Sequence, residues 1–321
     1  MTTLISQPSN LPSSPSIPDP APTPIEPLAL STGHAVRLAA RANTLTTTTS
    51  GLAPSHLQAN LLILPSRYAA DFRLLCARNP VPCPLLAESA TPGSFTTLTS
   101  HIPSLPASRL LSSYDLDLRR DCPRYHVYRD GRLVPPPRAG HHRLDIRDEW
   151  TPDHVAFLLG CSFSFEAALA AAGLPPRHTR QARVVPMYRT RIPLCPAGVF
   201  ADATHVVSMR SYPASRLDAV RRITRAYGAT HGEPVAWGWG SLARLGIAAI
   251  DAPEWGDAPL TEDGRPLGAV CGSEEEVPVF WGCGVTPQEA VMRAGLEGTV
   301  MAHAPGHMLV LDCVDEDIMG S

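Results

Sequence analysis

The sequence predicts an α/β fold, with a mostly parallel central sheet, helices on both faces of it, and a smaller α/β subdomain. Two observations lead to this prediction. Apolar runs of strand length recur along the chain, as in residues 61–64 and 277–281, and a helix-forming segment follows each of them. Strands that alternate with helices are typical of parallel sheets, because each helix carries the chain back to the start of the next strand.

The first half of the chain contains these elements in order: a helix from residue 32, a strand over 61–64, a helix over 67–78, a hairpin over 125–134, and a strand over 155–160 that enters an alanine-rich helix. The helix over 67–78 ends at a proline-rich segment, because a residue that precedes proline disfavours the helical conformation. Asp130 and Gly131 indicate the hairpin, since this pair suits a tight turn between two strands.

The second half continues with a strand over 206–209, a helix over 215–227, a strand over 277–281, a helix over 287–297 and a short strand over 308–311. Thr286 is expected to cap the helix that begins at Pro287, because proline is favoured at the first helical position and threonine just before it.

The domain organisation follows from composition and element order. Residues 1–29 contain eight prolines, so we expect residues 1–30 to form a disordered tail. We expect residues 31–185 to begin the main α/β domain, 186–245 to form the smaller subdomain, and 246–321 to complete the main domain.

Lysine is absent from the chain, and all 27 basic side chains are arginine. A pyridoxal phosphate enzyme needs a lysine for its Schiff base, and a Walker A loop needs one for its phosphates. The sequence therefore excludes both classes. The eight cysteines contain no C-x-x-C pair, which argues against a structural zinc site and favours reduced thiols.

Charge and hydropathy indicate which partners to expect. The formal net charge is −3, which offers nothing attractive to nucleic acid or to an anionic membrane. No apolar run approaches the roughly 18–20 residues that cross a bilayer. The N-terminus lacks a secretory signal pattern. We expect a cytoplasmic protein, with the mitochondrial matrix left open, that binds a small molecule and needs no cofactor or metal; homo-oligomers are left open.

A strand-turn-helix unit over 155–173 carries polar side chains in its turn. The apolar strand stops at Gly160, and Ser162, Ser164 and Glu166 follow at the start of the helix. The free N–H groups of a helix start suit an anionic ligand, so the serines are candidates for substrate binding and Glu166 for a catalytic base. An ordinary capped helix explains the same pattern, and both interpretations stay open here.

Two cysteines and two histidines are further candidates. Cys161 and Cys283 each follow an apolar strand and precede a helix, a place that lowers a thiol pKa and favours a nucleophile; a small buried residue at a tight turn is the alternative. His303 and His307 are four residues apart, but the intervening Ala-Pro-Gly excludes the helical zinc motif. Catalytic, metal-binding and structural roles stay open for both histidines.

Tyr188, Arg189, Thr190 and Arg191 form a polar cluster. Arginine presents forked donors that match a carboxylate. The cluster therefore predicts a carboxylate-binding segment, although arginines on a solvated loop would give the same sequence.

The ordered motifs of this chain resemble the D-glutamate cyclase family, many of whose members are described only as hydro-lyases. The resemblance covers roughly residues 31–315 and is carried by Gln-Ala-Asn-Leu-Leu-Ile-Leu-Pro (58–65), Arg-Asn-Pro-Val-Pro-Cys-Pro-Leu (78–85), Phe-Leu-Leu-Gly-Cys-Ser-Phe-Ser-Phe-Glu (157–166), Val-Pro-Met-Tyr-Arg-Thr (185–190), Val-Ser-Met-Arg (207–210), Trp-Gly-Cys-Gly-Val-Thr-Pro-Gln (281–288) and His-Ala-Pro-Gly-His (303–307). It implies a two-part α/β protein that cyclises D-glutamate to 5-oxo-D-proline with loss of water. A hydro-lyase for another small carboxylic acid and a non-catalytic carboxylate-binding protein are the alternatives.

Cyclisation requires a base for the amine and an acid for the departing oxygen. In our hypothesis Glu166 or His303 is the base and His307 is the acid. Arg189 binds the α-carboxylate of the substrate, and Arg210 neutralises its γ-carboxylate. A thioester on Cys161 or Cys283 would be a covalent variant. The remaining residues assigned to substrate binding are Ser162, Ser164, Tyr188, Thr190, Thr286 and Gln288, of which Ser164, Tyr188 and Thr190 would stabilise the oxyanion.

Overall fold

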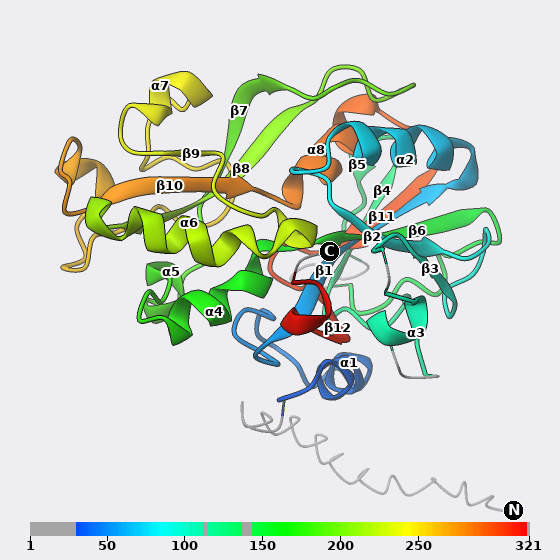
Figure 1. Cartoon of the computed structure of the whole chain (residues 1–321). Helices are drawn as coiled ribbons and strands as arrows, with labels where there is room; N and C mark the ends of the chain where they lie inside the picture. The colour runs from blue at the N-terminus through cyan, green and yellow to red at the C-terminus, as the bar shows by residue number, and fades with distance from the viewer. Residues whose placement is uncertain (1–29, 104, 112–114, 137–142, 320–321) are drawn as a thin grey trace, which may run out of the picture.

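The computed structural model describes residues 30–103, 105–111, 115–136 and 143–319. The disordered tail predicted for residues 1–30 therefore falls almost wholly outside the described residues. Figure 1 shows two β-sheets side by side, with helices packed around both of them.

The larger sheet, sheet A, contains eight described strands in the order β3-β2-β6-β1-β11-β4-β5, and β12 also pairs with β1. Its central strand, β1, pairs with β6 along one side, and with β12 and then β11 along the other. The bounds are β1 His56–Pro65, β2 Leu85–Ser89, β3 Leu98–Ser100, β4 Tyr125–Arg129, β5 Arg132–Leu133, β6 His154–Gly160, β11 Thr299–His303 and β12 Leu309–Val314.

The smaller sheet, sheet B, has the order β7-β8-β10-β9. Its strands are β7 Met187–Pro193, β8 Thr204–Tyr212, β9 Ala236–Trp237 and β10 Val277–Gly282. The domain boundaries expected from the sequence stay predictions; sheet B itself takes its strands from residues 187–282.

The predicted mostly parallel sheet is wrong, because every pairing between the described strands is antiparallel. Helix α2 (Ala69–Arg78) does carry the chain from β1 to β2, and these two strands run in the same direction. They are not neighbours, however, because β6 lies between them and pairs antiparallel with both. Strand β1, helix α2 and strand β2 do follow one another along the chain, but β6, which comes later in the sequence, lies between the two strands in the sheet.

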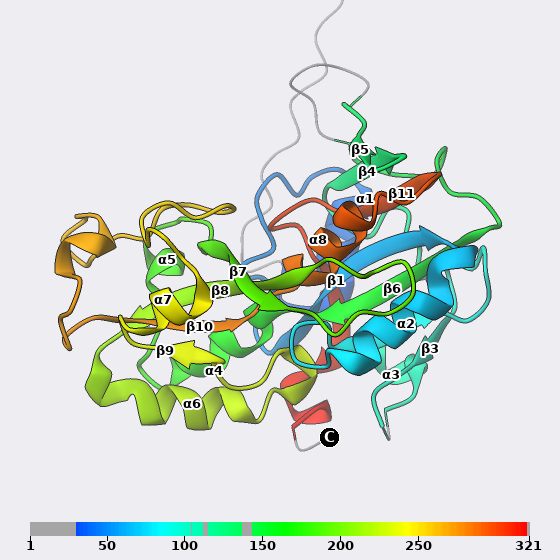
Figure 2. The ribbon, with the colours of Figure 1, turned by 90° about the horizontal axis from the view of Figure 1, so that it is seen from above.

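The helices cover both sheets and have these bounds: α1 Gly33–Arg41, α3 Ala107–Leu110, α4 Glu166–Ala171, α5 Arg177–Arg180, α6 Leu217–Arg225, α7 Ser241–Leu245 and α8 Val285–Ala294. Short 3-10 turns lie at Ser66–Tyr68, Ser162–Phe165, Ala214–Arg216, Gly228–Thr230, Leu267–Val270 and Asp315–Asp317. Figure 2 shows α6 along sheet B and α2 along sheet A.

One hydrophobic core joins the two sheets. Leu61 of β1 and Leu158 of β6 belong to the same buried cluster as Val220 of α6 and Trp281 of β10. The opposite face of β1 packs against α2 and α8. A strand buried on both faces has a continuous apolar sequence, which is more common in parallel sheets; here antiparallel strands are covered on both faces as well.

Several predicted elements are confirmed. Helix α1 begins as expected, and Thr32 Oγ1 accepts a hydrogen bond of 3.2 Å from the Ala35 N–H. The hairpin β4–β5 turns at Asp130 and Gly131, which both have positive φ. The predicted cap of α8 is wrong, because the helix begins at Val285 with Gly284 before it.

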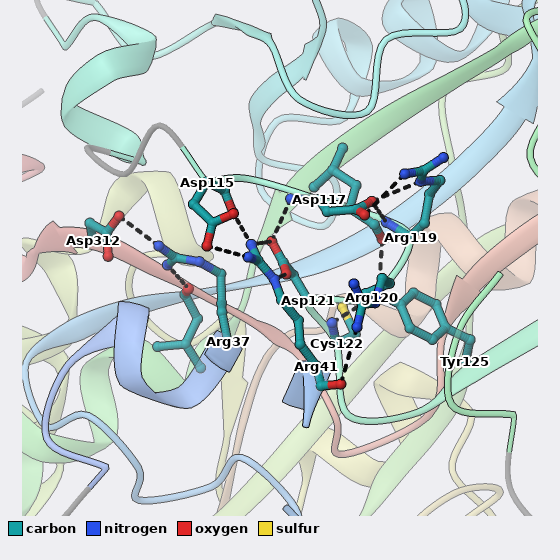
Figure 3. Close-up of polar contacts among 12 residues, drawn as sticks. Arg37, Arg41, Asp115, Asp117, Arg119, Arg120, Asp121, Cys122, Tyr125 and Asp312 are labelled. Atoms are coloured by element: carbon teal, nitrogen blue, oxygen red, sulfur yellow. Dashed lines mark hydrogen bonds and ion pairs between the residues drawn. The ribbon is translucent and has the colours of Figure 1, made fainter. Parts of the chain in front are cut away.

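A partly buried arginine–aspartate network fastens α1 to the rest of the protein (Figure 3). Arg41 contacts Asp115 and Asp121, and its Nη2 lies 3.0 Å from Asp121 Oδ2. Arg37 donates to the Val310 carbonyl and to Asp312, at 2.8 Å each. This network ties the first described helix to strand β12 and to the segment around residue 121.

Candidate active site

Three chain corners that are far apart in sequence meet around Asn60 on β1. Its Nδ2 donates to the carbonyl of Gly160, where β6 ends, at 2.9 Å. Its Oδ1 lies 3.0 Å from Nε2 of His303, where β11 ends. A methyl group on Gly284, between β10 and α8, would lie only 1.9 Å from Asn60 Nδ2, so this close approach requires glycine.

Beside these corners lies a buried ion cluster formed by Glu166, Arg210 and His178. Arg210 Nε donates to Glu166 Oε1 at 3.0 Å, and its Nη2 contacts the same oxygen. His178 Nε2 lies 3.3 Å from that oxygen. Arg210 also donates to Ser208 Oγ at 2.9 Å and to Ser162 Oγ at 3.1 Å. Its side chain has no exposed surface, so its guanidinium is committed to these partners.

Glu166 is ionised in this cluster. Burial alone would raise its pKa, but attraction to His178 and Arg210 and hydrogen bonds from both outweigh burial and lower the pKa to about 2. The hydrogen bonds and ion pairs that its carboxylate makes with described residues all involve Oε1. At neutral pH it is therefore a fixed carboxylate rather than a proton acceptor, and Oε2 is left for a ligand.

A cavity of about 380 Å³ lies against Glu166. It is lined by residues 51–56 and by Gln58, Phe163, Ser164, Glu166, Ala167, Ala170, Pro175, Pro176, Thr179 and Arg180. Ser164 Oγ accepts a hydrogen bond of 3.1 Å from the Gln58 N–H. A smaller hollow of about 20 Å³ is lined by His178 and Arg210, among others, which is room for a water molecule.

Both candidate histidines lie at the corner between β11 and β12. His303 is buried, and burial lowers its pKa to about 4, so it is neutral at pH 7. Its Nδ1 lies 2.8 Å from the Ala304 carbonyl, and its Nε2 lies 2.9 Å from Gln288 Nε2. His307 is half-buried, with Nδ1 2.9 Å from the Pro305 carbonyl. Neither histidine lines the 380 Å³ cavity.

The two candidate cysteines are both buried at strand ends. Burial raises the pKa of Cys161 to about 12 and that of Cys283 to about 11. Both are therefore protonated thiols near neutral pH. The covalent variant of the mechanism requires a thiolate, which this environment opposes.

The structure places three other candidates away from the cavity, in contacts that support the fold. The Tyr188 hydroxyl donates to the Ile250 carbonyl at 2.5 Å, and the Thr190 hydroxyl to the His205 carbonyl at 2.8 Å. Thr286 Oγ1 bonds both the N–H and the carbonyl of Val206, which fastens α8 to β8.

Arg189 pairs with Glu289 at 2.8 Å, and its guanidinium carbon lies 5.1 Å from the Trp255 ring centroid. It too is absent from the cavity lining. The segment that contains Tyr188 and Arg189 is strand β7, not a solvated loop.

Sequence reasoning did not select Gln58, Asn60, His178 or Ser208. A signal was present for the first two, because they are the polar residues of the otherwise apolar run 57–64, and buried polar residues in a strand need partners. Nothing in the local sequence distinguishes His178, which reaches Glu166 only through the folding of the chain.

In the part of the chain that the structure describes, no group of three or more histidine, cysteine, aspartate or glutamate residues could hold a metal ion. None of the described helices is long and apolar enough to span a bilayer.

Comparison with known proteins identifies the family. The family model for D-glutamate cyclase matches residues 155–312. A Bordetella pertussis protein named "putative hydro-lyase" is 47% identical over 285 residues, which cover 88% of this chain and 90% of that protein. A Schizosaccharomyces pombe protein with the same kind of name is 42% identical over 268 residues, covering 84% and 80%. A Bradyrhizobium relative is 45% identical over 271 residues, covering 84% and 87%. This chain therefore belongs to the D-glutamate cyclase family.

Proposed function

We propose that this protein is a hydro-lyase that cyclises D-glutamate to 5-oxo-D-proline with release of water, and that the reaction takes place in the cavity beside Glu166. The family and the names of the relatives supply the reaction class. The observation that carries the proposal is a buried, ionised carboxylate on the wall of a cavity of about 380 Å³. That volume lies within the roughly 300–1,000 Å³ of small-molecule sites.

The reaction balances without an outside reagent. The substrate nitrogen begins as an ammonium and loses two protons in total, one before and one after it attacks the γ-carboxyl carbon. A C–N bond forms and a C–O bond breaks, and both protons leave with the departing oxygen as water. The site therefore has to hold the chain bent and move protons from nitrogen to oxygen.

We assign the attraction of the ammonium to Glu166, whose Oε2 has no partner among the described residues. The fixed carboxylate is too weak a base to keep the proton. His178 Nε2 lies 3.3 Å from Glu166 Oε1, and its attraction to that carboxylate helps to keep Glu166 ionised, so we assign to His178 the positioning of Glu166 beside the ammonium. The sequence-based hypothesis gave the base to Glu166 or His303; here Glu166 is assigned the binding of the ammonium instead.

The substrate carboxylates need donors, and the cavity offers two. Ser164 accepts a hydrogen bond from the Gln58 N–H, and its own proton can be donated to the γ-carboxyl oxygen as charge develops there. Arg180 lines the cavity and pairs with Glu262, and both side chains are substantially exposed. Exposed ion pairs contribute little stability, so Arg180 can exchange Glu262 for a substrate carboxylate.

The test is to incubate the purified full-length chain separately with D-glutamate and L-glutamate and to measure 5-oxoproline by chiral chromatography. We expect product from D-glutamate only. His178→Gln should remove most of the turnover. His101→Gln is the matched control, because His101 lies 3.4 Å from Glu88 in a similar pair but away from the cavity, and it should retain activity.

Other outcomes would overturn the proposal. Thermal stabilisation by D-glutamate without product would indicate a carboxylate-binding protein instead, because a ligand that binds only the folded state stabilises it. Water loss from a different small acid, with none from D-glutamate, would indicate another hydro-lyase. Equal losses in the two histidine variants would remove His178 from the mechanism.

A further inference from the structure

Gln58 is a buried amide with one hydrogen bond too few. Its side chain is on β1, and the residue is only 3% exposed. Its Nε2 donates to the Thr49 carbonyl at 2.9 Å, which identifies that atom as the amide nitrogen, since a carbonyl can only accept. Its Oε1 is buried and has no partner among the described residues. A buried acceptor without a donor is unfavourable and requires an explanation.

The surroundings of Gln58 point to a ligand. Gln58 lines the 380 Å³ cavity together with Ser164 and Glu166. The facing loop holds Ala53 at φ 44° and Ser55 at φ 65°, the left-handed region that residues with a side chain adopt at an energetic cost. Such strain is concentrated at binding and catalytic sites. The strained loop and the unpartnered acceptor are independent observations on one cavity.

We propose that Gln58 Oε1 binds the amino group of the substrate beside Glu166, and that it makes the cavity prefer amino dicarboxylates over dicarboxylates that lack the amine. This inference rests on the proposed function and deepens it. An ammonium offers three N–H donors, whereas a carboxylate offers none, so an acceptor at this place selects the amine. Oε1 is covered in this structure, so binding requires the amide to rotate about its terminal torsion, which is broad in glutamine, and to give up its bond to Thr49.

A neutral acceptor also suits the reaction. Glu166 attracts the nitrogen most strongly while it is charged. The Gln58 carbonyl continues to accept an N–H from the neutral amine, so the nitrogen stays oriented after it loses its first proton. Gln58 is therefore a substrate-binding residue that positions the attacking nitrogen.

Two variants separate this role from support of the loop. Gln58→Met loses both the acceptor and the bond to Thr49. Gln58→Glu also loses the bond to Thr49 but keeps an acceptor, now charged. Each variant is checked for its melting temperature, and the affinities of D-glutamate and of glutarate, which has no amino group, are measured by calorimetry on the full chain.

We expect Gln58→Met to weaken D-glutamate binding by roughly tenfold to a hundredfold, the value of one hydrogen bond to a charged group, and to leave glutarate binding unchanged. Gln58→Glu should raise the ratio of D-glutamate to glutarate affinity above that of the wild type. If Gln58→Met does not fold, the affinity ratio measured for Gln58→Glu still tests the inference.

The inference would be overturned if Gln58→Met weakened the binding of D-glutamate and of glutarate equally, or if Gln58→Glu left the ratio of the two affinities unchanged. Gln58 would then serve only to hold Thr49 in place. The proposed function would survive that result if the wild type still forms 5-oxoproline. A wild type that neither binds nor converts D-glutamate would defeat the proposed function itself, and this inference with it.

Discussion

Replacing Glu166 with glutamine removes one charge from the buried cluster and keeps the shape of the side chain. The pKa of Glu166 falls from 4.5 to about 2 in the folded protein, because attraction to His178 and Arg210 outweighs the effect of burial. One pKa unit corresponds to about 1.4 kcal/mol, so the charged form of Glu166 stabilises the fold by about 3 kcal/mol at neutral pH. This value agrees with the loss of about 3–5 kcal/mol in stability that usually follows when one partner of a buried ion pair is removed.

The sign of the pH dependence follows from the lowered pKa. This stabilisation is fully present above pH 4.5, the pKa in the unfolded chain, and is lost as the pH falls toward 2. Protonated Glu166 has the charge and nearly the shape of glutamine. The wild type and Glu166→Gln should therefore differ by about 3 kcal/mol in free energy of unfolding at pH 7 and converge near pH 2.

The assay is urea denaturation of both proteins at pH 7, 5 and 3, followed by tryptophan fluorescence. Trp281 is a suitable probe, because its ring centroid lies 5.4 Å from the Arg210 guanidinium carbon. Taking the difference between the two proteins at each pH cancels the titration of the groups that do not interact with residue 166. Glu262→Gln is the control: its carboxylate is 67% exposed and also pairs with an arginine, and it should change stability little. A difference as large at pH 3 as at pH 7, or none at pH 7, would refute the reasoning.

Three further predictions concern other buried groups. Arg41→Met should lower the free energy of unfolding by about 3–5 kcal/mol, because it leaves the fully buried carboxylate of Asp121 without its charged partner; chemical denaturation measures this. Iodoacetamide at pH 7.5 should leave Cys161 and Cys283 unlabelled in the folded protein, since burial raises their pKa values to about 12 and about 11, and peptide mass spectrometry checks it. Asp315→Asn should stabilise the protein by about 1–3 kcal/mol at pH 8 and not at pH 4, because burial raises the Asp315 pKa to about 6, so that its charged form is unfavourable above that pH.

Each of these predictions has an internal comparison. Arg109→Met removes an arginine that is 62% exposed and pairs with Asp317, so it should cost only about 0–1 kcal/mol; an equal loss in both arginine variants would contradict the first prediction. The exposed Cys195 and Cys271 should be labelled in the same digest, and equal labelling of all cysteines would contradict the second. If Asp315→Asn raised the free energy of unfolding by the same amount at pH 8 and pH 4, ionisation of Asp315 would not be the cause, and the third prediction would be wrong.

The sequence predicted many elements of this fold but not the direction of its strands. Apolar periodicity and capping residues are local, and they located β1, α2, the β4–β5 hairpin, β6, α6 and β10. The placement of β6 between β1 and β2 depends on pairing between residues some 70 to 100 positions apart. No local pattern encodes that pairing, and a helix between two strands is compatible with neighbouring or separated partners.

Some residues of the candidate site could also be predicted from local sequence, and others could not. Glu166, Cys161 and Cys283 stand out in the sequence because they follow apolar strands, and the structure places all three near Arg210. His178 carries no such mark. Tyr188 looked like a ligand-binding residue, but a hydroxyl next to an arginine does not reveal that its strand turns it toward Ile250.

The cluster around Glu166 also bears on how a substrate would enter. A helix start suits an anion, and the sequence alone therefore suggests a carboxylate of the substrate at this turn. Helix α4 has only six residues, and its first residue is Glu166 itself, already ionised. A second carboxylate there would face a like charge in a poorly solvated place, which is costly. The cationic end of an amino acid is attracted to the same place, and its carboxylates then lie toward Arg180 at the exposed side of the cavity. We therefore expect an amino dicarboxylate to bind with its amino group innermost.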